Sequence, residues 1–185
     1  MTVLHTIGHG TRSVPELVAA LGAAGVDVLV DVRRHPGSRR NPQLSGPSLA
    51  AELPAAGDIA YEWWGDELGG RRSGSVDSRH GVWRNDSFRA YADHMDTPGF
   101  RDAFRALVGR SAGEALAVMC AETLWWRCHR RLLADAATLQ GIEVVHLLGE
   151  GRSASHTLHP GVRADADGWP VYDVGAPPQL WQGES

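Results

Sequence analysis

The sequence contains no lysine, and its only cysteines are Cys120 and Cys128. Two cysteines are too few to hold a disulfide-based fold, and free thiols are typical of the reducing cytoplasm, where we expect this protein. The apolar run Val26 to Val30 is interrupted by Asp27, and no apolar run approaches the roughly 18–20 residues that cross a bilayer. Met1 leads almost directly into a strand-like segment, so we expect neither a secretory signal nor a membrane partner.

Strong charge of either sign is also missing. The 185 residues carry a formal net charge of −4, with 43% hydrophobic and 22% charged residues. These proportions are typical of one globular domain and exclude a disordered, fibrous or coiled-coil chain. Residues 161–185 hold one arginine against four acids, so the rest of the chain is near neutral. The sequence is therefore not a generally basic nucleic-acid binder, although its arginine clusters leave local anion sites open.

Apolar patterns alternate between strand-like and helix-like segments along the first 148 residues. We predict strands at Thr2–Ile7, Val26–Val32, Ile59–Trp63, Ala115–Cys120 and Glu143–Leu148. We predict helices at Val14–Ala24, Ser48–Leu53, Ser87–Met95, Pro98–Val108 and Trp125–Leu139. Strands that alternate with helices indicate βαβ units. The predicted fold is a single α/β domain, in which a mainly parallel central sheet carries helices on both faces as three layers.

Two stretches depart from this alternation. Asp66–Asn85 is rich in glycine and arginine and has little to bury, so we predict a flexible insertion at about 66–85, either a lid or a surface loop. From Gly149 the periodicity is lost. We therefore predict an α/β domain over residues 1–148 and an extended tail over 149–185 without a core of its own. The sequence assigns no role to His156 or His159 in that tail.

Three loops that follow predicted parallel strands carry most of the unusual residues. The first contains Gly8-His9-Gly10, the second runs from Asp31 to Arg40, and the third contains Cys120-Ala121-Glu122 and leads toward Cys128-His129-Arg130. In an open parallel sheet such loops emerge at one edge, where α/β proteins build their sites. We therefore predict one site at that edge.

Six short motifs in these segments occur together and in order. They are Thr6-Ile7-Gly8-His9, Val30-Asp31-Val32-Arg33, Pro36-Gly37-Ser38-Arg39, Leu68-Gly69-Gly70, Met119-Cys120-Ala121-Glu122 and Cys128-His129-Arg130. Over residues 4–148, approximately, the chain resembles the DUF488 family, a domain of unknown function. The resemblance implies a cytoplasmic bacterial or archaeal α/β protein, and it implies no particular activity.

The residue types at the predicted edge indicate an enzyme that acts on a small anionic substrate, phosphate-bearing or nucleotide-like. Asp31 and Glu122 are candidate carboxylates for acid–base catalysis, with His9 or His129 as the partner in proton transfer. Cys120 is a candidate nucleophile, because nearby arginines and a following helix would lower the pKa of its thiol. These five residues are the predicted catalytic set.

The arginines of the second loop are candidates for binding the substrate. Four guanidinium groups occur between positions 33 and 40, and crowding them is costly unless a carboxylate or phosphate lies among them. Glycines in the first loop would let backbone N–H groups approach an anion. The predicted substrate-binding residues are Arg33, Arg34, Ser38, Arg39, Arg130, Gly8 and Gly10.

Two other chemistries would use the cysteines. A rhodanese-like layout with sulfur or group transfer through Cys120 fits the Asp-Val-Arg after a strand, but residues 121–126 offer two tryptophans and no glycine to wrap an oxyanion. A metal site of Cys120, Cys128 and His129 has no recognised zinc spacing. A helix from Trp125 would also place Cys128 on its buried stripe and separate it from His129. We therefore predict no cofactor, and a metal bound by these three residues stays an alternative.

A non-enzymatic alternative is a module that binds single-stranded nucleic acid. Its bases would stack on tryptophans interleaved with arginines, namely Trp63, Trp64, Trp83, Trp125 and Trp126. Tryptophans at helix starts more often fill a core, and a near-neutral body offers few phosphate contacts. The sequence specifies neither the substrate nor the oligomeric state.

Overall fold

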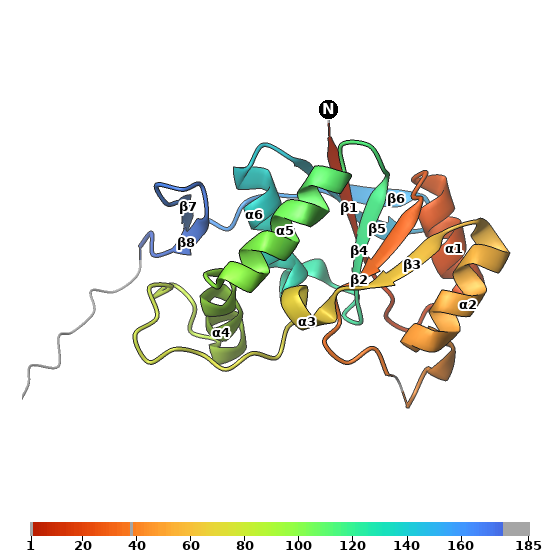
Figure 1. The fold of residues 1–185 in the computed structure, drawn as a ribbon, viewed down its shortest axis with the longest axis horizontal. Coiled ribbons are helices and arrows are strands. Elements are labelled where there is room, and N and C mark those ends of the chain that lie inside the picture. Colours follow the sequence, from red (N-terminus) through yellow and green to blue (C-terminus); the bar gives the residue numbers. More distant parts are fainter. Residues whose placement is uncertain (1, 38, 176–185) are drawn as a thin grey trace, which may run out of the picture.

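A six-stranded sheet forms the centre of the protein in a computed structural model, which describes residues 2–37 and 39–175. The strands are β1 (Val3–Gly8), β2 (Val28–Asp31), β3 (Ala60–Trp63), β4 (Leu116–Cys120), β5 (Glu143–Gly149) and β6 (Arg152–Ser155). They lie in the order β3-β2-β4-β1-β5-β6 (Figure 1). All neighbours run parallel except β6, which is antiparallel to β5. The predicted α/β fold with a mainly parallel sheet is confirmed.

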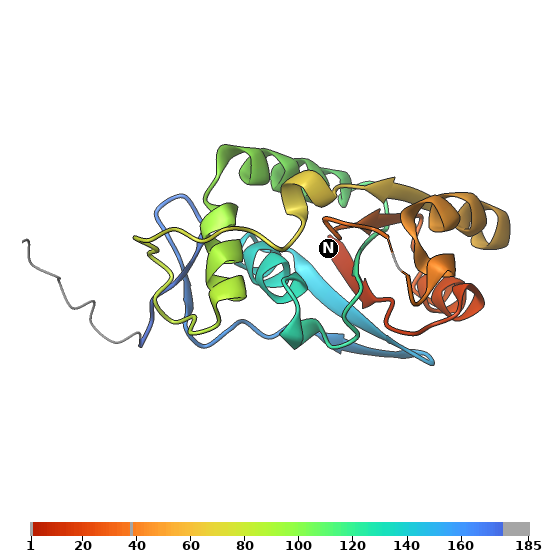
Figure 2. The ribbon, with the colours of Figure 1, turned by 90° about the horizontal axis from the view of Figure 1, so that it is seen from below.

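Helices cover both faces of the sheet, as the sequence predicts. On one face lie α1 (Val14–Ala23) and α2 (Gly46–Gly57), and on the other lie α4 (Asp86–Met95), α5 (Pro98–Arg110) and α6 (Arg130–Leu139) (Figure 2). Strand β2 is buried along its whole length. Val28 and Val30 enter the core beneath α4, α5 and α6, whereas Leu29 enters the core beneath α1 and α2. A slip of one residue would exchange the two faces, so this alternation fixes the register of β2.

Helix α6 begins later than the sequence predicts. Trp125–Arg127 form a short 3-10 helix, and Cys128 has an extended backbone before α6 starts at Arg130. Trp125 is stacked on His146 of β5, with ring centroids 4.1 Å apart. This tertiary contact outweighs the helical spacing of the sequence. The predicted helix is therefore wrong over its first turn, and Cys128 does not lie on a helical stripe.

The segment predicted as a flexible insertion is anchored at several points. It begins near the short helix α3 (Gly65–Leu68), and Leu68 and Trp83 are both buried. The hydroxyl of Tyr91 on α4 donates a hydrogen bond to the carbonyl of Leu68 at 2.7 Å. The expectation of little to bury is wrong at these positions, while a lid role for the segment stays a prediction.

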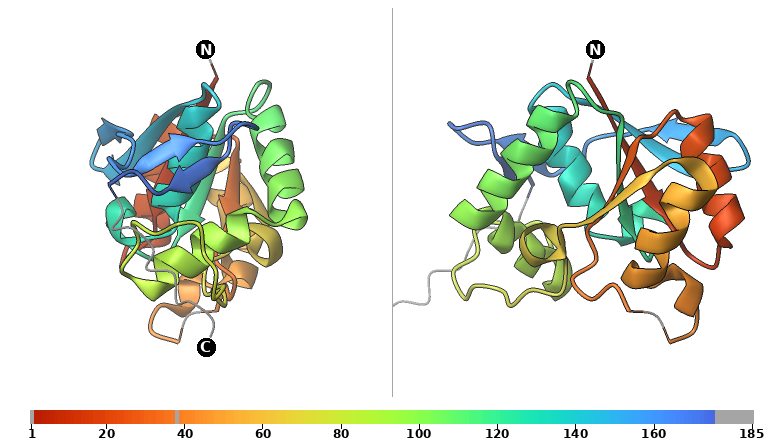
Figure 3. Two further views of the ribbon diagram at one scale, coloured as in Figure 1. Left: turned by 90° about the vertical axis from the view of Figure 1, so that its left-hand side faces the viewer. Right: turned by 45° about the vertical axis from the view of Figure 1, so that its right-hand side comes forward.

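Residues 149–175 pack against the sheet and α6. Strand β6 extends the sheet, and β7 (Val162–Ala164) pairs with β8 (Pro170–Tyr172) in a hairpin beside α6 (Figure 3). Trp169 and Tyr172 are buried in the core that α5 and α6 cover. The segment predicted as a tail thus supplies side chains to the core of the body. Among the residues described here, no helix is long and apolar enough to cross a membrane.

Candidate functional site

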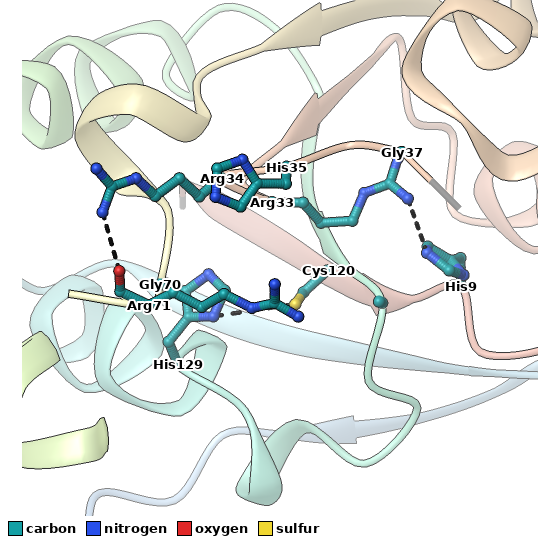
Figure 4. A pocket seen from close by; sticks show the side chains of 10 residues that line it. His9, Arg33, Arg34, His35, Gly37, Gly70, Arg71, Cys120 and His129 are labelled. Carbon is teal, nitrogen blue, oxygen red and sulfur yellow. Dashed lines mark hydrogen bonds between the residues drawn. The ribbon is translucent and has the colours of Figure 1, made fainter. Parts of the chain in front are cut away.

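A pocket of about 230 Å³ opens at the edge of the sheet where β1, β2 and β4 end (Figure 4). Its lining comes from the three predicted loops, from the segment after α3 and from the start of α6. The lining residues are His9, Arg33, Arg34, His35, Gly37, Gly70, Arg71, Cys120, Ala121 and His129. The structure therefore brings His9, Cys120 and His129 of the predicted catalytic set to one cavity.

Asp31 and Arg33 form a buried ion pair beside this pocket. Two guanidinium nitrogens of Arg33 donate to the two carboxylate oxygens of Asp31 at 2.9 and 2.6 Å. The hydroxyl of Tyr61 donates to Asp31 at 2.7 Å, and burial together with Asp31 raises the pKa of Tyr61, which keeps this donor protonated. Asp31 is fully buried and does not line the pocket. Its contacts position Arg33.

Arg33 in turn orients His9. A terminal nitrogen of Arg33 donates to Nε2 of His9 at 2.9 Å. Because a guanidinium has donors only, His9 accepts here and carries its proton on Nδ1, which donates to the carbonyl of Gly10 at 2.9 Å. Burial lowers the pKa of His9, with Arg33 adding to the effect and the bond to Gly10 opposing it. His9 is a neutral imidazole held in one tautomer.

The glycines of the first loop let β1 approach the loop after β4. A Cβ atom on Gly8 would lie 2.0 Å from the carbonyl oxygen of Glu122, and Gly10 has a φ of +50°. The N–H groups of His9 and Gly10 donate to two carbonyls of that loop, each at 2.9 Å. The amides of His9 and Gly10 are thus engaged in joining two loops, and binding of an anion through Gly8 and Gly10 stays a prediction.

Two arginines of the pocket carry exposed side chains. Arg34 donates to the carbonyl of Arg71 at 2.9 Å, and the side chain of Arg71 extends into the pocket toward Cys120 (Figure 4). Within the described part of the chain, neither guanidinium has a carboxylate at ion-pair distance. Arg71 has a φ of +58°, which is uncommon for a residue with a side chain and occurs often at functional positions. Both arginines are available to an anion.

Cys120, Cys128 and His129, which we call the Cys–His cluster, meet at the same edge. The two Sγ atoms and Nδ1 of His129 lie within 4.8 Å of one another. Nδ1 is 3.6 Å from Cys128 Sγ and 3.9 Å from Cys120 Sγ, and Nε2 is 3.1 Å from the carbonyl oxygen of Val32. The expectation that Cys128 and His129 are separated is wrong, because both residues precede α6.

The two thiols differ in exposure and in acidity. Cys120 is partly exposed, whereas Cys128 is buried. A hydrogen bond with Cys128, together with burial, raises the pKa of Cys120. Burial acts in the same direction on Cys128, but the contact with Cys120 and the charge and backbone N–H of Arg130 lower its pKa overall. The expectation of a lowered pKa at Cys120 is wrong, because the arginine and the helix start act on Cys128 instead.

Glu122 and Arg130 lie in opposite environments. Glu122 is exposed and lines a second cavity of about 600 Å³, which all three residues of the Cys–His cluster also line. Arg130 is only 1% exposed, and its guanidinium donates to the carbonyls of Glu122 and Thr123. These bonds hold the loop after β4 in place. Proton transfer by Glu122 and anion binding by Arg130 stay predictions.

The remaining arginines of the second loop lie away from the pocket. Arg39 and Arg40 are exposed and do not line it. Ser38, which the sequence also assigns to substrate binding, lies outside the described residues. Of the predicted arginine cluster, the Arg33 guanidinium is therefore internal, and Arg34 is the one further member that lines the pocket.

The five tryptophans considered for base stacking do not share one surface. Trp83 is buried, Trp64 packs against the core, and Trp125 stacks on a histidine of β5. Trp63 and Trp126 are exposed, on β3 and in the turn before α6. These side chains offer no continuous platform for a single strand.

Sequence reasoning did not place Arg71 or His35 among the site residues. Arg71 follows the Leu68-Gly69-Gly70 motif, and both lie in the segment at about 66–85 that the sequence predicts as a lid or a surface loop. A Cβ atom on Gly70 would lie 3.0 Å from Nδ1 of His129, so this glycine lets the segment pass close to the cluster. The motif next to Arg71 was therefore the available signal.

Comparison with known proteins identifies a family but no activity. A family model described as domain of unknown function DUF488 matches residues 13–137, which is more than half of the chain. No curated protein and no solved structure matches it. The match confirms the resemblance found in the sequence, over a shorter range, and includes β2, β4 and the Cys–His cluster.

Proposed function

Because the chain belongs to the DUF488 family, a domain of unknown function, we propose its activity from the chemistry of the pocket. The protein is an enzyme, a hydrolase or transferase, that acts on a small anionic substrate, phosphate-bearing or nucleotide-like. Its two free cysteines fit a cytoplasmic location, where thiols stay reduced.

One observation carries this proposal: Arg34 and Arg71 line a cavity with Cys120 and His129, the Arg71 side chain extends into it, and neither arginine has an acidic partner among the described residues. Guanidinium groups bind carboxylates and phosphates through two parallel hydrogen bonds. A bound anion would supply the missing negative charge and would hold the rest of the substrate against the Cys–His cluster.

The other residues divide into two roles. Glu122 lines a common cavity with the thiols and His129, so its carboxylate is the group that would exchange protons with a substrate. Asp31 and Arg33 position His9, which reaches the pocket as a neutral imidazole. This assignment changes Asp31 from a carboxylate of acid–base catalysis to a positioning residue.

Binding of anions to the purified protein tests the proposal. Titration calorimetry with phosphate, pyrophosphate and nucleoside monophosphates should show binding that the corresponding neutral nucleosides do not show. Arg71→Gln and Arg34→Gln should each weaken it at least tenfold. Arg105→Gln, which removes an exposed guanidinium on α5, is the matched control and should leave it unchanged.

Salt dependence separates this function from the nucleic-acid alternative. The affinity of a pocket for one small anion should fall with salt concentration as expected for about one or two charge contacts. The affinity of a nucleic-acid surface with many phosphate contacts should fall far more steeply. Absence of binding for every anion at millimolar concentration, or equal binding by the wild type and both pocket variants, would overturn the proposal. Turnover of the ligands that bind then distinguishes an enzyme from a binding module.

A further inference from the structure

The Cys–His cluster has the dimensions of a metal site. A tetrahedral zinc ion with bonds of about 2.3 Å to sulfur and about 2.0–2.1 Å to nitrogen places its ligand atoms about 3.6–3.8 Å apart. In the structure, Nδ1 of His129 is 3.6 Å from Cys128 Sγ and 3.9 Å from Cys120 Sγ. All three ligand atoms lie within 4.8 Å of one another. The two nitrogen-to-sulfur distances therefore match those around a zinc ion to within a few tenths of an ångström.

The imidazole of His129 is oriented for metal binding. Nε2 lies 3.1 Å from the carbonyl oxygen of Val32. A carbonyl accepts only, so Nε2 carries the proton and Nδ1 presents its lone pair to the two sulfurs. Histidine ligands of metals are typically held in this way, with the outer nitrogen donating to a carbonyl or carboxylate. The ring also packs against Tyr91, with centroids 4.9 Å apart.

The backbone places the two cysteines together without help from sequence spacing. Cys120 ends β4, and Cys128 precedes α6 in an extended conformation. The chain between them is fixed by Trp125, which stacks on His146, and by Arg130, which holds the carbonyl of Glu122. The cluster is therefore built from two elements that are each anchored in the core.

Charge favours thiolates at this position. The backbone N–H of Arg130 donates to Cys128 Sγ at 3.5 Å, as N–H groups do to metal-bound thiolates. The buried Arg130 guanidinium has no carboxylate at ion-pair distance in the described part of the chain. Zn²⁺ would displace the two thiol protons and leave a neutral unit of one divalent cation and two thiolates. The ion therefore adds no net charge to a buried place in which the Arg130 guanidinium already lies without an acidic partner among the described residues.

We propose that Cys120, Cys128 and His129 bind one Zn²⁺ ion. Two thiolates and an imidazole are ligands that zinc prefers, and among the described residues no further His, Cys, Asp or Glu joins the cluster. The fourth position is thus left to water or substrate, an arrangement typical of catalytic rather than structural zinc. The proposal goes beyond the anion-binding function, because metal binding requires no substrate and depends on none of the pocket arginines.

Metal analysis of the full chain tests this inference. The protein is purified without chelator, incubated with excess Zn²⁺ under reducing conditions and desalted. Inductively coupled plasma mass spectrometry should then find one zinc per chain. Loss of a residue that only hydrogen-bonds a metal ligand lowers the affinity for the metal by about 10- to 100-fold. Loss of a ligand itself should cost more, so Cys120→Ser, Cys128→Ser and His129→Gln should each lower the affinity for zinc by more than this. His35→Gln is the matched control, since it removes a pocket imidazole outside the cluster, and should retain one zinc.

Two measurements on the wild type keep the test decisive where a variant does not fold. Co²⁺ should replace Zn²⁺ and give thiolate-to-cobalt charge-transfer absorption. Zn²⁺ should protect both thiols from an alkylating reagent. Folded, reduced protein that retains less than one tenth of an equivalent of zinc, or that forms a Cys120–Cys128 disulfide and takes up no metal after reduction, overturns the inference. Because Arg71→Gln should keep its zinc, failure of anion binding and failure of metal binding are distinguishable.

Discussion

Asp31 shows how a residue type common in catalysis can act by positioning another side chain. Its two oxygens accept hydrogen bonds from Arg33 and Tyr61. Arg33, held in this way, donates to Nε2 of His9 and orients its ring. A lone buried carboxylate would be costly, and the guanidinium offsets that cost. Acid–base chemistry is therefore assigned to a carboxylate that lines a cavity, namely Glu122.

Removal of the Asp31 charge should destabilise the protein strongly. Asp31→Asn leaves Arg33 buried without a counter-charge, and breaking a buried pair in this way costs about 3–5 kcal/mol. Asp102→Asn breaks an exposed pair with Arg105 and should change the free energy of unfolding by less than about 1 kcal/mol. Urea denaturation of both variants measures the difference. Equal, small losses would show that Asp31 does not hold the site together.

Stability should fall as the pH is lowered below neutrality. Burial, together with His156 and Arg130, lowers the pKa of His146 to about 3. The unfolded chain, with an ordinary histidine pKa of about 6.5, binds a proton that the native protein does not bind. The stabilisation from neutral His146 is therefore complete above pH 6.5 and is lost progressively toward pH 3. One such group contributes a slope of about 1.4 kcal/mol per pH unit.

His146→Gln tests this pH dependence through the slope rather than through the absolute stability. Between pH 7 and 4.5, the free energy of unfolding should fall less steeply in the variant. The two slopes should differ by up to about 1.4 kcal/mol per pH unit, the effect of one proton. His35→Gln shows how much of any change follows from the loss of a histidine at an exposed position. Parallel curves for wild type and His146→Gln would contradict the prediction.

At the scale of elements, local patterns determine most of the fold but not the start of α6. The β-branched run of β2 is buried on both faces as predicted, and Ser13 and Glu16 form the capping box that starts α1. The residues from Trp125 follow helical spacing too, yet Trp125 stacks on His146 of β5. Such a contact between distant segments has no local signal, and it moves Cys128 into the site.

The candidate site was predictable to the extent that it follows from parallel topology. Loops after β1, β2 and β4 meet at one edge, which brings His9, Arg34 and Cys120 together as expected. Arg71 reaches the same pocket from a segment outside the regular βα alternation, so topology gives no reason to expect it. The ion pair that Arg33 forms with Asp31 also depends on side-chain packing that the sequence pattern does not specify.

The segment around Arg71 should respond to anions. Arg71 is exposed, whereas Arg72 donates to the carbonyl of Gly69 and Arg79 pairs with Asp96. An arginine-specific protease should therefore cut the free protein first after Arg71. Millimolar phosphate or nucleotide should slow this cut severalfold if the segment closes on the bound anion. Cleavage after the exposed Arg152 is the internal control, and equal rates with every anion tried would reduce the segment to a passive loop.

At the scale of the whole molecule, the C-terminal region is tied to the helix that begins at the Cys–His cluster. Asp135 of α6 is fully buried and accepts hydrogen bonds from Nε2 of His156, the N–H of His159 and the hydroxyl of Tyr172. These three donors come from residues beyond β5. This gives the His156 side chain a structural role, while His159 contributes its backbone, and it joins the C-terminal hairpin to the element that supports the site.

Truncation of Trp169 should therefore lower the free energy of unfolding as much as truncation of a buried residue of the sheet. It is 2% exposed and packs edge-on against Phe104, with ring centroids 5.6 Å apart, while the guanidinium of Arg101 lies 4.9 Å above its indole. Trp169→Ala removes a large buried ring and should lower the free energy of unfolding by about 3–5 kcal/mol.

Val174→Ala is the matched substitution for Trp169→Ala. Val174 belongs to the same C-terminal region but is 48% exposed, so its truncation should change the free energy of unfolding by no more than about 0.5 kcal/mol. If the region only lay on the surface of the body, Trp169→Ala would cost as little as Val174→Ala. Denaturation by urea, followed by circular dichroism, separates the two cases. A large cost, with one cooperative transition in both variants, would show that the hairpin folds together with the sheet.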